Sequence, residues 1–203
     1  MIVKKWINKA YPIFKTEQKI ADVFKEKEEF NLSTVVIKDG NGYLTGVIKK
    51  KDLKKFDPEQ KLGDVASDVT YYCFDKDLVE DAVLLLIESH DFVVPVVNEE
   101  LKLKGVITVF EVLEALMEIT SMAVESVRIT FLLPDRPGYL KKIVDVLADE
   151  EINILSLITT PDEGGQKRVI IRTEKMNSEY IAGILEENDI VFDSVSEEEG
   201  FSV

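Results

Sequence analysis

The sequence predicts an α+β protein made of three small modules, and three observations support this. A motif recurs at a fixed offset in the first part of the chain, apolar residues follow strand and helix periods in turn, and the repeat stops after Ser121. The 203 residues are 45% hydrophobic and 32% charged, as in a folded globular chain. We expect modules at residues 1–60, 61–122 and 123–203.

The repeat appears when the chain is shifted against itself by 59 positions. Gly46-Val47-Ile48 then falls on Gly105-Val106-Ile107, and Asp22 falls on Asp81, with no gap between them. Each copy has the predicted order β-α-β-β-α. An internal duplication therefore accounts for the first two modules.

In the first copy, the apolar spacing predicts a helix over Lys19–Phe30. The β-rich runs Val35–Lys38 and Tyr43–Ile48 predict two strands, and the turn residues Asp39–Gly42 separate them. The polar, proline-containing stretch Phe56–Gln60 is interpreted as a linker to the second copy.

In the second copy, a helix is expected from Asp77 to about His90, followed by strands at Val93–Val97 and Leu101–Ile107. The stretch Ala82–Ile87 is apolar in every direction around the helix axis. Such helices are usually buried on more than one side, so we expect a partner for this helix.

The third module is predicted to have the order β-α-β-β-α-β of the ferredoxin-like fold. Its strands are expected at Val127–Leu133, Asn153–Thr160, Gln166–Arg172 and Ile190–Val195, and its helices at Leu140–Ala148 and Ser178–Asn188. The acidic end Glu197–Gly200 is expected to be a solvated tail.

The charge is distributed unevenly along the chain. The net charge is -14 overall, but residues 1–61 carry 14 basic and 9 acidic residues, whereas residues 62–122 and 123–203 are net -10 and -9. This balance disfavours nucleic acid as a partner. The basic excess instead marks Lys49–Lys55 as a place for a small phosphorylated ligand.

Several protein classes are disfavoured by what the sequence lacks. The single cysteine, Cys73, cannot form an internal disulfide, and the longest apolar runs, such as Val83–Ile87, are short for a membrane span. Met1–Ala10 does not resemble a signal peptide. We therefore expect a cytoplasmic location and no membrane contact.

No catalytic function is expected. His90 is the only histidine, which excludes a multi-histidine metal site, and the common nucleophile and phosphate-loop motifs do not occur. Carboxylates distant in sequence could still pair in space, so an unrecognised enzyme stays an alternative.

The repeat of about 60 residues, with three residues between Gly46-Val47-Ile48 and Asp52, resembles a pair of CBS domains. The third module, with Asp135-Arg136-Pro137-Gly138 and Ile152-Asn153-Ile154, resembles an ACT domain. The order CBS-CBS-ACT is similar to the acetoin-utilisation family of regulatory proteins.

The CBS resemblance implies that residues at the start of each last helix meet the phosphate and ribose of an adenosyl ligand. The matching residues are Thr108 and Glu111 in one copy and Lys49 and Asp52 in the other. Glu111 departs from the usual aspartate, and Thr-x-x-Glu is equally a helix capping box. Lys49 replaces the usual hydroxyl, although a lysine can neutralise phosphate; the alternative is a solvated basic helix face.

The same resemblance implies that the first strand of a repeat supplies another wall. This nominates Pro12 and Ile13 in one copy and Tyr71 and Tyr72 in the other, where ordinary packing is the alternative for the tyrosines.

The ACT resemblance implies an amino acid at the loop with Asp135, Pro137 and Gly138, beside Asn153 and a neighbouring subunit. Glycine allows close backbone approach there, although Pro-Gly also suits a simple helix start.

Together these features predict a ligand-sensing regulatory protein without a resident cofactor or metal. The expected ligands are AMP, ADP, ATP or S-adenosylmethionine in the CBS pair and an amino acid in the ACT domain. A homodimer would change geometry on binding and act on an unknown regulated protein. The alternative is a structural or interaction module that binds no small molecule.

Overall fold

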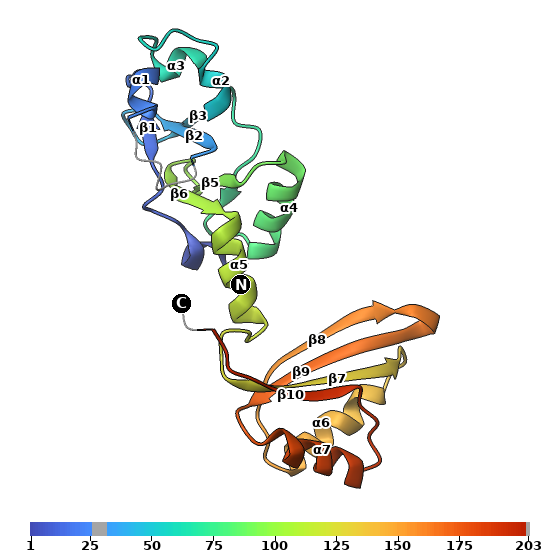
Figure 1. Cartoon of the computed structure of the whole chain (residues 1–203). Helices are drawn as coiled ribbons and strands as arrows, with labels where there is room; N and C mark the ends of the chain where they lie inside the picture. The colour runs from blue at the N-terminus through green and yellow to red at the C-terminus, as the bar shows by residue number, and fades with distance from the viewer. Residues whose placement is uncertain (26–31, 202–203) are drawn as a thin grey trace. The chain divides into compact units, whose positions relative to one another are not determined.

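Residues 1–25 and 32–201 are described by the computed structural model, and they form two units, Met1–Ala115 and Leu116–Val203 (Figure 1). The first unit holds both repeats, and the second holds the third module. Of the helix predicted over Lys19–Phe30, the part at positions 26–30 lies outside the described residues.

The two repeats build two three-stranded sheets with the same connections. The first sheet has the order β1-β2-β3 and the second β4-β5-β6; in each, the first pair is parallel and the second antiparallel. The strands are β1 (Ile13–Lys15), β2 (Thr34–Lys38), β3 (Leu44–Lys49), β4 (Cys73–Phe74), β5 (Val93–Val97) and β6 (Leu103–Thr108). The duplication in sequence is thus a duplication of structure.

The helices of the first unit differ more between the repeats than the strands do. The helices are η1 (Val3–Trp6), α1 (Ile20–Val23), α2 (Lys50–Leu53), α3 (Leu62–Val65), α4 (Val79–Ser89) and α5 (Val109–Ile119). Where the second repeat has the long helix α5 after its last strand, the first has the single turn α2. Five of the first seven residues after Ile48 are lysines, and three of them, Lys50, Lys51 and Lys54, stand where α5 has Val109, Phe110 and Leu113.

Each repeat is completed by the chain segment that precedes the other repeat. Asn8, near the N-terminus, pairs with Val106 of the second sheet, and Ser67, after the linker, pairs with Val47 of the first sheet. The two contacts correspond under the offset found in the sequence. Buried Val3 accordingly belongs to the core around Cys73 in the second repeat.

A contact between equivalent residues marks the internal two-fold relation. Tyr43 forms a bridge with Lys102, its own counterpart in the other repeat. The amide of Leu44 donates to the carbonyl of Leu101, and that of Leu103 donates to Gly42 at 2.9 Å. The repeats therefore face each other, and residues from both can line one cavity.

The second unit is a four-stranded antiparallel sheet with the order β10-β7-β9-β8. Figure 1 shows both of its helices below the sheet. Its elements are β7 (Ser126–Pro134), α6 (Tyr139–Asp149), β8 (Ile154–Asp162), η2 (Glu163–Gly165), β9 (Gln166–Glu174), α7 (Ser178–Glu187) and β10 (Ser194–Glu198). The core includes Ile129, Phe131, Ile143, Leu147 and Ile181, all buried. The predicted α+β class and β-α-β-β-α-β order are confirmed.

The end of the chain corrects one prediction. The last strand was expected at Ile190–Val195 with a solvated acidic tail after it, but β10 begins at Ser194 and includes Glu198. Buried Ile190 packs in the core before the strand starts. Glu198 accepts a hydrogen bond from Arg172 Nε at 2.9 Å, and the Arg172 side chain is only 8% exposed. A buried cation thus holds the acidic end on the sheet.

Helix α4 corrects a second prediction. It was expected to be buried on more than one side, and the described residues bury only Val79, Ala82 and Leu86. Leu84 and Ile87 are each 64% exposed. The face carrying these two side chains is therefore available for a partner, which stays a prediction.

Candidate functional site

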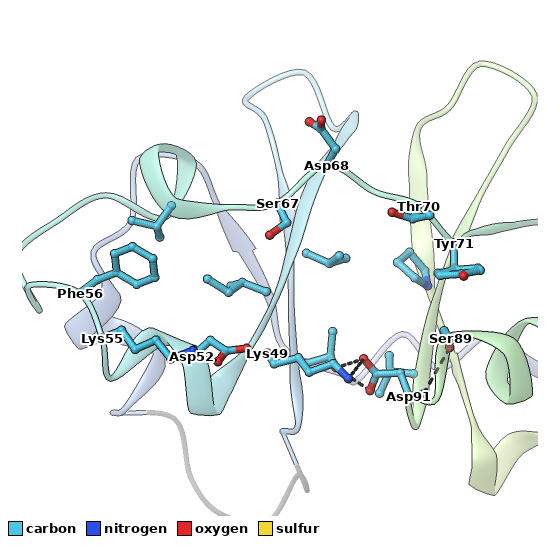
Figure 2. A pocket seen from close by; sticks show the side chains of 16 residues that line it. Lys49, Asp52, Lys55, Phe56, Ser67, Asp68, Thr70, Tyr71, Ser89 and Asp91 are labelled. Atoms are coloured by element: carbon cyan, nitrogen blue, oxygen red, sulfur yellow. Dashed lines mark hydrogen bonds and ion pairs between the residues drawn. The ribbon is translucent and has the colours of Figure 1, made fainter.

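A cavity of about 470 Å³ lies in the first unit between the two repeats (Figure 2). We call it the inter-repeat cavity. Its lining residues come from both repeats and are Thr34, Val47, Ile48, Lys49, Asp52, Lys55, Phe56, Val65, Ser67, Asp68, Thr70, Tyr71, Ser89, Asp91, Val93 and Pro95. Figure 2 shows Phe56 toward one end and Tyr71 toward the other.

A charged pair joins the repeats across the cavity. Lys49 Nζ lies 4.0 Å from Asp91 Oδ2. The Thr34 hydroxyl lies 2.7 Å from both carboxylate oxygens of Asp91, to which it donates. The Asp91 side chain is 14% exposed, while that of Lys49 is 44% exposed. In this pair, the Asp91 carboxylate is held by Thr34, whereas Lys49 is exposed enough to contact a ligand.

Asp52, from the first repeat, is another carboxylate in the cavity lining. Lys55 Nζ lies 2.6 Å from its Oδ1. The hydrogen bond from Lys55 lowers the pKa of Asp52, and the charges of Lys55, Lys51 and Lys49 act in the same direction. Asp52 is therefore ionised at neutral pH and acts purely as a hydrogen-bond acceptor.

The corresponding residues of the second repeat are engaged with one another. Glu111 Oε2 accepts from the Thr108 amide at 2.8 Å and from the Thr108 hydroxyl, and Glu111 Oε1 accepts from Asn8 Nδ2 at 2.7 Å. The Thr108 oxygen in turn accepts from the Phe110 amide at 3.1 Å. These contacts form the capping box that the sequence offered as an alternative.

Tyr11 lies at the second junction between the repeats, which corresponds to the inter-repeat cavity under the offset of 59 positions. Tyr11 corresponds to Thr70 of the second repeat. Its hydroxyl donates to the Thr34 carbonyl at 2.5 Å. Burial raises the pKa of Tyr11 well above its usual value. The first unit is therefore asymmetric: a cavity at one repeat junction corresponds to a packed tyrosine at the other.

The four residues predicted to form another wall of the ligand site do not lie together. Tyr71 lines the inter-repeat cavity with Lys49 and Asp52, although it belongs to the other repeat. Tyr72 lines a different cavity of about 300 Å³ and packs edge-on against Phe74, with ring centres 5.7 Å apart. Pro12 and Ile13 line neither of these cavities.

The nominated ACT residues lie at two ends of the sheet. Asp135 follows β7, pairs with Lys167 at 2.7 Å, and precedes Gly138, whose φ of 96° lies in the left-handed region. Asn153 precedes β8 at the end of the sheet where Glu174 lies, and the Glu174 amide donates to its carbonyl at 3.1 Å. Strand β7 pairs with β9 over nine residues between these ends. One chain therefore does not bring Asn153 beside the Asp135 loop.

Sequence reasoning missed several cavity residues from the second repeat, chiefly Ser67, Asp68 and Asp91. They belong to no local motif. The offset of 59 positions gave one indication, because it matches Ser67 with Asn8. In the structure, each of these residues pairs with a strand of the other repeat. Asp91 corresponds to Leu32, so the repeat itself gave no reason to expect a carboxylate there.

Two kinds of feature are absent from residues 1–25 and 32–201. No group of three or more histidine, cysteine, aspartate or glutamate side chains there could hold a metal ion. No helix in that part of the chain combines the length and apolar character needed to cross a bilayer.

Comparison with known families agrees with the fold. The model of the CBS domain matches residues 62–118, and the model of the ACT domain matches residues 127–187. A CBS domain pair/ACT domain protein of Thermotoga maritima superposes with a TM-score of 0.54 and 29% identity, covering 58% of this chain and 98% of that one. The chain therefore carries a CBS domain pair followed by an ACT domain.

Two other proteins are similar to a part of this chain. The magnesium transporter MgtE of Thermus thermophilus is 36% identical over 84 residues, which are 40% of this chain but only 18% of the transporter. CBSX2, solved in complex with AMP, superposes with a TM-score of 0.51 and 23% identity over 58% of this chain and 97% of that one. These comparisons do not test the resemblance to the acetoin-utilisation family, which stays a prediction.

Proposed function

We propose that this chain is a ligand-sensing regulatory protein whose CBS pair binds an adenine nucleotide in the inter-repeat cavity. The observation that carries the proposal is the meeting of Lys49 and Asp52 with Tyr71 and Asp91 from the other repeat around one cavity of about 470 Å³. This volume lies within the range of about 300 to 1,000 Å³ that is usual for small-molecule sites.

The lining supplies one kind of group for each part of a nucleotide. Asp52 accepts hydrogen bonds from the ribose hydroxyls, because its lowered pKa keeps it ionised. Lys49 neutralises the first phosphate as a point charge. Val65, Pro95 and the Tyr71 ring offer apolar surface to the base. The fold shared with CBSX2, a protein solved with AMP, supports an adenine nucleotide as the first probe.

The second repeat junction is not proposed as a nucleotide site. Both oxygens of the Glu111 carboxylate already accept hydrogen bonds from within the protein, and Tyr11 is packed beside β2. Ribose recognition by Glu111 would break these bonds and leave polar groups without partners, which is costly in a partly buried place. One nucleotide per chain is therefore expected.

The ACT domain is proposed to bind an amino acid only as a pair of chains. Strand β8 is an edge of the described sheet, so a second copy can pair with it antiparallel about a two-fold axis. That pairing brings Asn153 of one copy toward the Asp162 end of the other, which adjoins its Asp135 loop. The amides after Gly138, at the start of α6, suit a carboxylate.

A homodimer also covers the exposed apolar side chains of the first unit. Leu84 and Ile87 on α4 and Phe110 and Leu113 on α5 are between 51% and 67% exposed. A second copy that packs against these helices would bury them. A ligand that prefers one arrangement of the two copies then shifts the population toward it, which is the signal we propose.

Isothermal titration calorimetry of the full chain with AMP, ADP, ATP and S-adenosylmethionine tests the nucleotide proposal. We expect saturable binding of at least one of the four, with one site per chain. Circular dichroism confirms that the sample is folded. Absence of heat from all four with folded protein would refute the proposal and favour an interaction module without a small-molecule ligand.

A further inference from the structure

A second cavity adjoins the inter-repeat cavity on the other side of the Lys49–Asp91 pair. Its volume is about 600 Å³, and both Lys49 and Asp91 line it as well as the first cavity. The pair therefore stands between the two spaces, with its ammonium and carboxylate 4.0 Å apart. We call the second space the lysine cavity.

The lining of the lysine cavity is strongly basic. Lys50, Lys51 and Lys54 line it together with Lys49, and His90 contributes a ring from the other repeat. Asp91 is the one carboxylate among its described lining residues, and it is already bonded to Thr34. Within the described residues, Lys51 and Lys54 have no carboxylate at ion-pair distance, whereas Lys55 is paired with Asp52. This local excess of positive charge calls for an anion with several charges.

A buried hydroxyl points to the same kind of ligand. Ser33 lines the lysine cavity, and its Oγ is buried without a hydrogen-bond partner among the described residues. A buried hydroxyl without a partner is uncommon and costs free energy. A phosphate oxygen is an acceptor that Ser33 could satisfy by donating its proton.

We propose that the lysine cavity receives the β- and γ-phosphates of a nucleotide whose ribose and base occupy the inter-repeat cavity. The proposal rests on the proposed nucleotide site and adds the ligand class, a nucleoside di- or triphosphate in preference to a monophosphate. Lys49 contacts the first phosphate at the boundary, and Lys51 and Lys54 contact the phosphates beyond it. Lys51 and Lys54 make the discrimination, because a monophosphate ends before it reaches them.

Titration calorimetry with AMP, ADP and ATP as sodium salts tests this division. We expect ADP and ATP to bind the full chain about tenfold or more tightly than AMP, the lower range for a hydrogen bond between charged groups. The double variant Lys51→Ala/Lys54→Ala should lose that advantage while its affinity for AMP stays within about twofold. The matched control Lys9→Ala/Lys61→Ala removes two exposed lysines that line neither cavity and should leave all three affinities unchanged.

The variant Ser33→Ala gives a second, independent result. It removes a buried hydroxyl that has no partner among the described residues, so the melting temperature of the free protein should stay the same or rise. ATP affinity should fall by about threefold or more while AMP affinity is unchanged.

The outcomes separate the two proposals. Equal affinities for AMP and ATP, or an equal loss for both in the Lys51→Ala/Lys54→Ala variant, would overturn the lysine cavity as a phosphate site and leave the nucleotide site intact. Absence of binding by all three nucleotides to folded protein would overturn both.

Discussion

Two carboxylates at matching positions of the repeats have opposite roles. Asp52 faces a cavity and contacts a flexible lysine, whereas Glu111 is held by Asn8 and by its own helix start. The sequence already contained the reason for this difference, since Thr-x-x-Glu is a capping box and Lys-x-x-Asp is not. It could not show that Asn8, over a hundred positions earlier, would complete the contacts of Glu111.

These two positions give a matched pair of variants. Asp52→Asn should weaken nucleotide binding by about tenfold or more, because an amide accepts ribose hydroxyls less well than a carboxylate. Glu111→Gln should leave nucleotide affinity within about twofold and lower the melting temperature, because it disturbs a capping box. Calorimetry and thermal unfolding measure the two effects. The reverse pattern would place the nucleotide at the second junction.

Tyr11 gives a prediction on stability. Tyr11→Phe keeps the ring but removes the hydroxyl that donates to the Thr34 carbonyl at 2.5 Å. We expect a loss of about 1 kcal/mol in the free energy of unfolding, the usual net value of a buried hydrogen bond. Urea denaturation measures it, with Tyr43→Phe as the exposed control. Equal stability of the two variants would contradict the account of the packed junction.

At the scale of elements, strands were predicted more accurately than the contacts between segments. The run of valines located β5 to the residue, because enrichment in β-branched residues is a local property of the sequence. The exchange of Asn8 and Ser67 between repeats depends on a non-local pairing, which periodicity does not encode. The site therefore combines Lys49 with Tyr71, residues that the sequence assigned to different repeats.

The contact between Arg172 and Glu198 of β10 leads to a prediction at this scale. Glu198→Gln should destabilise the second unit by about 1–2 kcal/mol, because it removes the charge that pairs with a largely buried guanidinium. The value is lower than for a fully buried pair, since the Glu198 side chain is 32% exposed. Urea denaturation compares it with Glu199→Gln, which removes a neighbouring charge outside that pair. Unequal midpoints are expected; coinciding midpoints would show that Arg172 does not depend on Glu198.

At the scale of the whole molecule, the proposed signal requires two copies of the chain. The double variant Leu84→Ser/Ile87→Ser replaces two side chains that are each 64% exposed, so the fold of the chain itself should be preserved. We expect light scattering after gel filtration to report a dimer for the natural chain and a smaller dimer fraction for the variant. A natural chain that is monomeric at all concentrations would contradict the proposed signal.

The net charge is informative only when it is counted separately for each module. A net charge of -14 disfavours anionic ligands for the chain as a whole, yet the basic residues of the first repeat gather around Lys49. The sequence predicted this location, because the lysines are consecutive. It could not predict that Asp91, from an acidic stretch, would divide the basic region into two cavities.

The central claim is that a nucleotide lies between the repeats, and a crystal structure of the full chain grown with ATP tests it most directly. We expect density for the ribose at Asp52, for the base near Tyr71 and Pro95, and for the phosphates beyond Lys49. Glu111 should keep its bonds to Thr108 and Asn8. Nucleotide density at Glu111, or an inter-repeat cavity without nucleotide at saturating ATP, would contradict the account.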